Sequence, residues 1–220
     1  MKKKIFIILS VLLVAAIVYF INAFFGNPIS KAKAEKEVLA YYEEKYHKDF
    51  EVYSSQYNFL IPDYNIKMRP TDDKDAVFET SRYELTMFDA YGAYLASMEL
   101  ESKIRRILDE KYPNLKYSLK VQEEHNIGVA GIVFDFFSPD PQTRLEKNFF
   151  IAELSWKRTG LNNEKTFELM DEIAASISSE LNGIPKQFSM DIYVKDSKNE
   201  KNSLQRHYLD GMDRGWKVEN

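Results

Sequence analysis

The stretch IFIILSVLLVAAIVYFINAFF, residues 5–25, contains no charged side chain and decides how the chain is organised. A helix of about 20 apolar residues is long enough to cross the hydrocarbon core of a bilayer. A secretory signal peptide is the alternative, but its apolar region is shorter and small residues precede its cleavage site. Here the large aromatic residues Phe24 and Phe25 occupy that place. We therefore predict that residues 1–26 form an uncleaved N-terminal membrane anchor.

The residues on either side of this stretch predict its orientation and its end. Lys2, Lys3 and Lys4 precede it, and basic residues next to a span stay on the cytoplasmic side. Asn27 and Pro28 follow it, and this pair both ends one helix and starts the next. We expect a single-pass protein of the cell membrane, with the N-terminus inside and the C-terminal domain outside. The lysine-rich outer part fits a Gram-positive cell envelope.

The composition of the chain beyond the anchor excludes several classes of protein. The whole chain has 30 basic and 34 acidic residues, and three of the basic ones precede residue 27, so the outer part carries a net charge of about 27 − 34 = −7. Such a chain lacks the basic face that nucleic acids require. Cysteine is absent, which excludes disulfides, thiolate metal sites and a lipid-modified cysteine.

Hydrophobic periodicity beyond residue 27 predicts a mixture of helices and strands. Apolar residues at steps of three and four predict helices over 28–46, 88–112 and 167–184. Alternating apolar and polar residues predict strands over 64–69, 115–122 and 188–195, and a continuous apolar run predicts another over 129–137. Further strands are predicted over 50–58, 76–85 and 149–156. Ser138-Pro139-Asp140-Pro141 is a break, and residues 207–220 are too few to place.

These elements predict an α+β fold in which two similar lobes, 27–87 and 88–220, each combine a helix with an antiparallel sheet. Glu44-Lys45-Tyr46 and Glu110-Lys111-Tyr112 end the first two helices, and a strand follows each, which indicates a faint internal repeat. No linker marks a boundary, so one continuous α+β domain is the alternative.

Several short motifs near the anchor resemble a known family. Gly26-Asn27-Pro28-Ile29-Ser30 follows the lysine-led anchor, Ala34-Glu35-Lys36 runs into Tyr41-Tyr42-Glu43-Glu44-Lys45-Tyr46, and Val52 and Tyr57-Asn58-Phe59 come next. Together they resemble uncharacterised YfjL-like membrane-anchored proteins of Bacillus and relatives, most clearly over residues 1–70. The resemblance implies a membrane location and carries no activity or functional residue with it. A helix on a curved antiparallel sheet is also similar to PepSY and cystatin-like modules, which is an analogy of fold alone.

Motifs for catalysis, metals or cofactors are missing from the sequence. His47, His125 and His207 are far apart and form no H-x-x-x-H pair, so each is interpreted as a surface residue. No Gly-x-Ser-x-Gly elbow or glycine-rich phosphate loop occurs. The acidic loop at 72–75 lacks the glycine and distal glutamate of a calcium loop and is interpreted as a solvated turn. We predict neither an enzyme nor a cofactor or metal.

Two carboxylates support the one catalytic hypothesis. Asp135 interrupts an apolar run, and a buried carboxylate there would have a raised pKa and could serve as an acid, although alternation equally places it on the solvated face. Asp140 follows it closely. A carboxylate-dependent hydrolase that uses Asp135 and Asp140 is therefore an alternative, and it requires both to face one cleft.

The tyrosines of the first half suggest binding instead. Tyr41, Tyr53, Tyr57 and Tyr64 are candidates for a surface that contacts a sugar or a protein, although tyrosines also fill half-buried sheet faces. We predict a membrane-anchored extracytoplasmic binding or interaction module of unknown ligand. Residues 5–25 would contact the membrane, and the outer part a membrane protein, a peptide or a cell-wall polymer. A structural spacer without a ligand is a further alternative.

Overall fold

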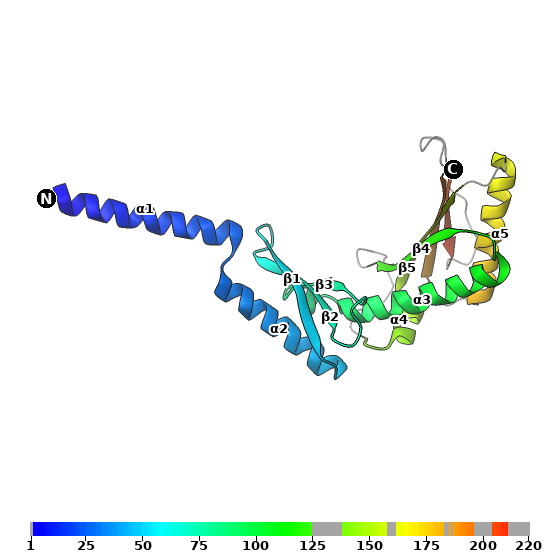
Figure 1. Cartoon of the computed structure of the whole chain (residues 1–220), viewed down its shortest axis with the longest axis horizontal. Coiled ribbons are helices and arrows are strands. Elements are labelled where there is room, and N and C mark those ends of the chain that lie inside the picture. The colour runs from blue at the N-terminus through cyan, green and yellow to red at the C-terminus, as the bar shows by residue number, and fades with distance from the viewer. Residues whose placement is uncertain are drawn as a thin grey trace. The chain divides into compact units, whose positions relative to one another are not determined.

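The structure, a computed structural model, describes residues 2–124, 138–157, 162–182, 185, 187–195 and 204–210. The chain folds into two compact units, Met1–Ala90 and Tyr91–Asn220 (Figure 1). The two similar lobes predicted at 27–87 and 88–220 stay a prediction. Each unit is described by itself below.

Two consecutive helices begin the first unit. Helix α1 spans Lys2–Phe25, and α2 spans Pro28–Tyr46, as the sequence predicts. Asn27 caps α2 because its side chain accepts a hydrogen bond from the backbone N–H of Ser30 at 2.9 Å. The chain turns between the helices at Gly26, whose positive φ of 68° suits glycine.

The described strands of the first unit form an antiparallel sheet in the order β1-β2-β3, with bounds Phe50–Asn58, Asp63–Pro70 and Phe78–Thr80. Helix α2 covers one face of this sheet, and the ring of Tyr42 lies 5.8 Å from that of Phe50 and 5.0 Å from that of Phe78. Ile66 and Met68 of β2 are fully buried in the same unit. Alternation along β2 therefore buries its apolar side chains, as its sequence predicts.

The third strand is shorter than predicted. The pattern over 76–85 predicts one strand, but β3 ends at Thr80 and a short 3-10 helix, η1, follows at Glu84–Thr86. The hydroxyl of Ser81 accepts the backbone N–H of Glu84 at 3.2 Å, and this local bond favours a turn over a continued strand.

The second unit contains three helices and four strands in its described residues. Their bounds are α3 Ala90–Lys111, β4 Tyr117–Glu124, α4 Pro141–Lys147, β5 Phe149–Lys157, α5 Asn163–Leu181, β6 Gln187–Lys195 and β7 Leu204–Asp210. The strands lie in the order β4-β5-β6-β7. These elements confirm the α+β class.

The second sheet is mixed, whereas the sequence pattern predicts an antiparallel one. β5 and β6 pair in parallel, and the other two pairs are antiparallel. The parallel pair follows from the connection, because α5 crosses back along the sheet and starts β6 at the same end as β5.

Two further elements were not predicted. The break at 138–141 starts α4, and Asp140 caps that helix with a bond from the backbone N–H of Thr143 at 2.9 Å. No periodicity predicts β7, because its sequence LQRHYLD mixes large polar residues with apolar ones, and its second half lies in the stretch 207–220 that the sequence does not place. The predicted strand over 129–137 lies outside the described residues.

One apolar core holds the second unit together. Apolar residues of α3 and α5 form a single cluster with the inward side chains of the sheet; examples from the helices are Leu100, Ile104, Met170 and Ile177, and from the strands Phe150, Leu154, Met190 and Ile192. Since both helices join the same set of strand residues, they cover the same face of the sheet.

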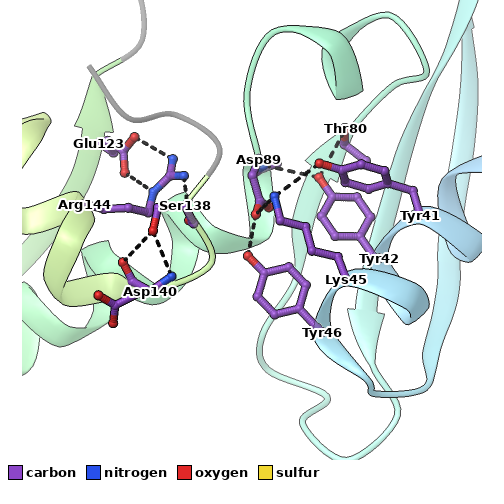
Figure 2. A network of polar contacts seen from close by, with 11 residues as sticks. Tyr41, Tyr42, Lys45, Tyr46, Thr80, Asp89, Glu123, Ser138, Asp140 and Arg144 are labelled. Carbon is purple, nitrogen blue, oxygen red and sulfur yellow. Dashed lines mark hydrogen bonds and ion pairs between the residues drawn. The ribbon is translucent and has the colours of Figure 1, made fainter. Parts of the chain in front are cut away.

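A buried ion pair lies at the edge of this core. The guanidinium of Arg144 donates to both carboxylate oxygens of Glu123, at 2.8 and 2.6 Å, and both side chains are fully buried (Figure 2). Arg144 also donates to the carbonyl oxygen of Ser138 at 3.1 Å, and Asn148 donates to Glu123 at 2.9 Å. The pair thus joins β4 to the start and the end of α4.

Replacing Glu123 by Met should destabilise the second unit by about 3–5 kcal/mol, because the buried charge of Arg144 then loses its partner. The double variant Glu123→Met with Arg144→Met should be less destabilised than Glu123→Met alone. Urea unfolding of the full chain, followed by tryptophan fluorescence, measures this unit, since both tryptophans of the sequence, at positions 156 and 216, come after residue 90 and Trp156 lies in its core. A double variant less stable than Glu123→Met would contradict the ion-pair argument.

Candidate functional site

Helix α1 exposes its apolar side chains along its described length. Ile8, Leu13, Phe20 and Phe24 are each more than half exposed. Among the described residues, one N-terminal helical segment is long and apolar enough to cross a membrane. Exposed apolar surface on this scale is unfavourable in water and favourable in lipid.

Tyr64 fixes the connection between α1 and the first sheet. Its hydroxyl donates to the carbonyl oxygen of Asn27 at 2.8 Å, accepts the backbone N–H of Asn27 at 2.8 Å and lies 3.0 Å from the hydroxyl of Ser30. The ring of Tyr57 packs beside Tyr64 at 5.1 Å. A side chain at Gly26 would collide with both tyrosines, so glycine is required there by space as well as by its φ.

The four tyrosines singled out by the sequence occupy different environments. Tyr53 is 61% exposed, and the guanidinium of Arg69 lies 5.2 Å from its ring centre. Tyr41 is half-buried beneath the ammonium of Lys45. Tyr57 is half-buried and Tyr64 is buried at the connection described above. Of these four, Tyr53 is the one whose side chain is exposed, and a binding role for any of them stays a prediction.

A buried carboxylate ties the C-terminal end of α2 to the segment before α3. Asp89 is fully buried, receives a hydrogen bond from the hydroxyl of Tyr46 and forms an ion pair with Lys45 at 2.7 Å (Figure 2). The hydroxyl of Tyr42 accepts the backbone N–H of Ala90 at 3.2 Å. No local sequence pattern predicts this network, because its partners lie more than 40 residues apart. Because the buried polar groups of this network are paired with one another, the network has a structural role.

The face of the second sheet opposite α3 and α5 carries a row of ionisable side chains. In the strand register, Lys120 of β4 pairs with Glu153 of β5, Glu153 with Asp191 of β6, and Asp191 with His207 of β7. Partners in register project from the same face of a sheet. We call Lys120, Glu153, Asp191 and His207 the charged row; it crosses all four described strands.

The centre of the charged row places two carboxylates side by side. Like charges directly opposite each other on neighbouring strands are destabilising. Nδ1 of His207 lies 2.8 Å from Oδ1 of Asp191, and Lys120 lies on the other side of Glu153, so positive or hydrogen-bonding groups flank the pair. Asp191 and His207 are partly accessible, with side-chain exposures of 20% and 31%.

Tyr193 lies beside the charged row, and its pKa depends on the two carboxylates. It lies two residues beyond Asp191 on β6, and its hydroxyl accepts a hydrogen bond from Gln205 at 3.3 Å. Burial raises the pKa of Tyr193, and the negative charges of Asp191 and Glu153 raise it further.

The charged row is not predicted by the sequence pattern. The alternation in 188–195 does place Asp191 and Tyr193 on the polar face of their strand. The neighbours of Asp191 follow only from the parallel pairing with β5 and from β7, and neither was predicted. His207 was interpreted as an isolated surface residue, whereas β7 brings it to Asp191.

Of the two carboxylates of the hydrolase hypothesis, the structure describes Asp140. Asp140 caps α4, and hydrogen bonds from the hydroxyl and the backbone of Thr143 hold its pKa below the ordinary value. Asp135 lies outside the described residues. Within the part of the chain that the structure describes, no group of three His, Asp or Glu side chains is placed to hold a metal ion.

The described features define an α+β protein whose N-terminal helix is apolar enough to span a membrane. Residues 1–96 match the family model described as "YfjL-like, N-terminal domain", which confirms the resemblance to YfjL-like proteins. The chain is also similar to the crystal structure of a DUF5037 family protein from Ruminococcus gnavus ATCC 29149, with 14% identity over 84% of this chain and 94% of that one and a TM-score of 0.47. No curated protein matches the chain.

Neutralising either carboxylate of the charged row should lower the pKa of Tyr193 toward its ordinary value, because a nearby negative charge disfavours the tyrosinate. Asp191→Asn and Glu153→Gln test this separately. Carbon-13 NMR of labelled tyrosine across an alkaline titration gives the pKa, and Tyr193→Phe identifies the resonance. Glu164→Gln, on the exposed first turn of α5, is the control and should leave the pKa unchanged. An unchanged pKa in both test variants would contradict the assigned cause.

Proposed function

We propose that this chain is a membrane-anchored interaction module, held outside the cytoplasm, which binds a partner through the charged row of its second sheet. The adjacent carboxylates Glu153 and Asp191 are the observation that carries the proposal. Their juxtaposition is unfavourable for folding even with Lys120 and His207 on either side, and departures from local folding rules are expected at functional sites. A basic side chain from a partner would relieve the repulsion.

The exposed apolar surface of α1 supports the anchor. A soluble helix buries its apolar stripe against its own domain, whereas Val11, Leu12, Leu13 and Val14 are all exposed although they point in different directions around α1. A helix that is apolar all round is suited to a lipid environment. The lysines at positions 2–4 favour an inward N-terminus, which places the two folded units outside.

The charges of the row favour a basic polypeptide segment as the partner. Two carboxylates accept the hydrogen bonds of a lysine or arginine side chain, and such charge-assisted bonds are stronger than neutral ones. Tyr193 and Gln205 lie beside the row and extend the surface with hydrogen-bonding groups. A membrane protein or a peptide with an exposed basic segment fits this surface better than an acidic wall polymer does.

Photo-crosslinking in living cells tests the proposal with the full-length chain. A benzophenone amino acid at Gln205, which is exposed beside the row, should capture a defined partner, and the same probe at Ser179 on the solvent side of α5 should not. Capture should persist when residues 1–26 are replaced by an unrelated anchor, because the outer part carries the recognition. Equal capture at both positions, or none at either, would favour a spacer role and contradict the proposal.

Charge variants then test the row itself. Glu153→Gln with Asp191→Asn should reduce capture by roughly tenfold or more, since each hydrogen bond to a charged group contributes about 1.5–3 kcal/mol. Glu164→Gln with Glu168→Gln removes the same charge from the exposed face of α5 and is the matched control. If the control reduces capture equally, net charge rather than the row explains the binding.

A further inference from the structure

The turn between β1 and β2 exposes three consecutive apolar side chains. Phe59, Leu60 and Ile61 are 56%, 78% and 47% exposed, and we call these three residues the hairpin tip. Tight turns ordinarily carry glycine, asparagine, aspartate or serine, so an apolar tip is unusual in water. No charged residue occurs between Asn58 and Pro62.

Local hydrogen bonds hold the backbone of the tip in place. The side chain of Asn58 accepts the backbone N–H of Leu60 at 3.1 Å and that of Ile61 at 3.4 Å. Asp63, directly after the turn, is buried and accepts hydrogen bonds from Arg82 at 2.9 Å and from the backbone N–H of Tyr83 at 3.1 Å. The polar side chains beside the tip therefore form hydrogen bonds within the protein, while the apolar side chains of the tip stay exposed.

The tip lies against the outer end of α1. The ring of Phe59 is 6.0 Å from that of Phe24, in the last turn of the helix. The bonds of Tyr64 to Asn27 and the close packing at Gly26 hold this end of α1 against the hairpin. Phe24 and Phe25 are themselves 54% and 76% exposed. The apolar surface of the helix thus continues onto the tip.

We propose that the hairpin tip inserts into the outer leaflet of the same bilayer that α1 spans, as a second membrane contact of the first unit. The inference rests on the proposed membrane anchorage of α1. A bilayer is favoured as the occupant because the tip continues the apolar surface of the span at the depth where the span ends. Aromatic and aliphatic side chains at such a boundary bury their apolar surface between the headgroups and the acyl chains.

A second contact would fix the first unit relative to the membrane plane. A single helix leaves a domain free to rotate about the helix axis, whereas a helix and a tip held together at Gly26 define one orientation of the β1–β2 hairpin. The loop at 71–75 lies at the opposite end of β2 and would then face away from the bilayer, because β2 is an extended strand of eight residues.

Site-specific fluorescence in lipid vesicles tests the insertion with the full-length chain. The protein has no cysteine, so Leu60→Cys, Lys74→Cys and Leu13→Cys each give one labelling position for an environment-sensitive nitrobenzoxadiazole dye. The labelled chains are reconstituted into vesicles of phosphatidylcholine and phosphatidylglycerol, with and without brominated acyl chains. Leu60 lies in the turn between β1 and β2, and Lys74 lies in the loop between β2 and β3. Both are exposed and form a matched pair, and Leu13 lies in the span.

We expect the dye at position 60 to emit at shorter wavelength and to lose intensity in brominated vesicles, because a shallowly inserted group contacts the acyl chains. The dye at position 74 should be unaffected, and the dye at position 13 should be quenched.

An unquenched dye at position 60 beside a quenched dye at 13 would overturn the insertion and leave the anchorage standing. Unquenched dyes at both positions would overturn the anchorage and the insertion together. A blue-shifted dye at 60 that brominated lipid does not quench would show a protein, such as a second copy, on the tip, and would also overturn the insertion. Circular dichroism of each variant verifies that it is folded.

Discussion

The hydroxyl of Tyr64 holds the first unit to its N-terminal helix. It hydrogen-bonds to the backbone N–H and carbonyl oxygen of Asn27 and to the hydroxyl of Ser30. One oxygen atom therefore pairs with three polar groups at the point where α1 ends and α2 begins. This arrangement needs close approach, and Gly26 permits it because any side chain there would meet Tyr64 and Tyr57. The direction of α1 relative to the β1–β2 hairpin, and the contact of Phe24 with Phe59, both depend on this connection.

Most buried charges of the described chain serve the fold. Asp89 is paired with Lys45 and hydrogen-bonded by Tyr46, and Glu123 is paired with Arg144 and Asn148. Burying charges is unfavourable unless partners replace the lost water, and both carboxylates have such partners. The charged row differs from these networks because it places Glu153 beside Asp191 on a partly accessible face. That contrast is the reason for assigning recognition to the row rather than to the deeper networks.

The proposed module combines two kinds of surface. The first unit presents apolar groups next to α1, whereas the second unit presents ionisable groups on the open face of its sheet. Lipid favours the first kind and a charged polypeptide the second. The apolar surface therefore suits lipid and the ionisable surface suits a charged polypeptide, and the two interactions can be tested independently.

The sequence by itself determined the features that depend on neighbours along the chain. The uncharged run at 5–25 predicts α1, Asn27-Pro28 marks the start of α2, and alternation predicts β2 and β6, because helix and strand periods are local. Only the tertiary structure decided which distant groups meet. The hydroxyl of Tyr64 reaches a residue 37 positions away, and the charged row exists only because a parallel crossover aligns Asp191 with Glu153 and β7 adds His207. Strand order and register set these contacts, and a local pattern specifies neither of them.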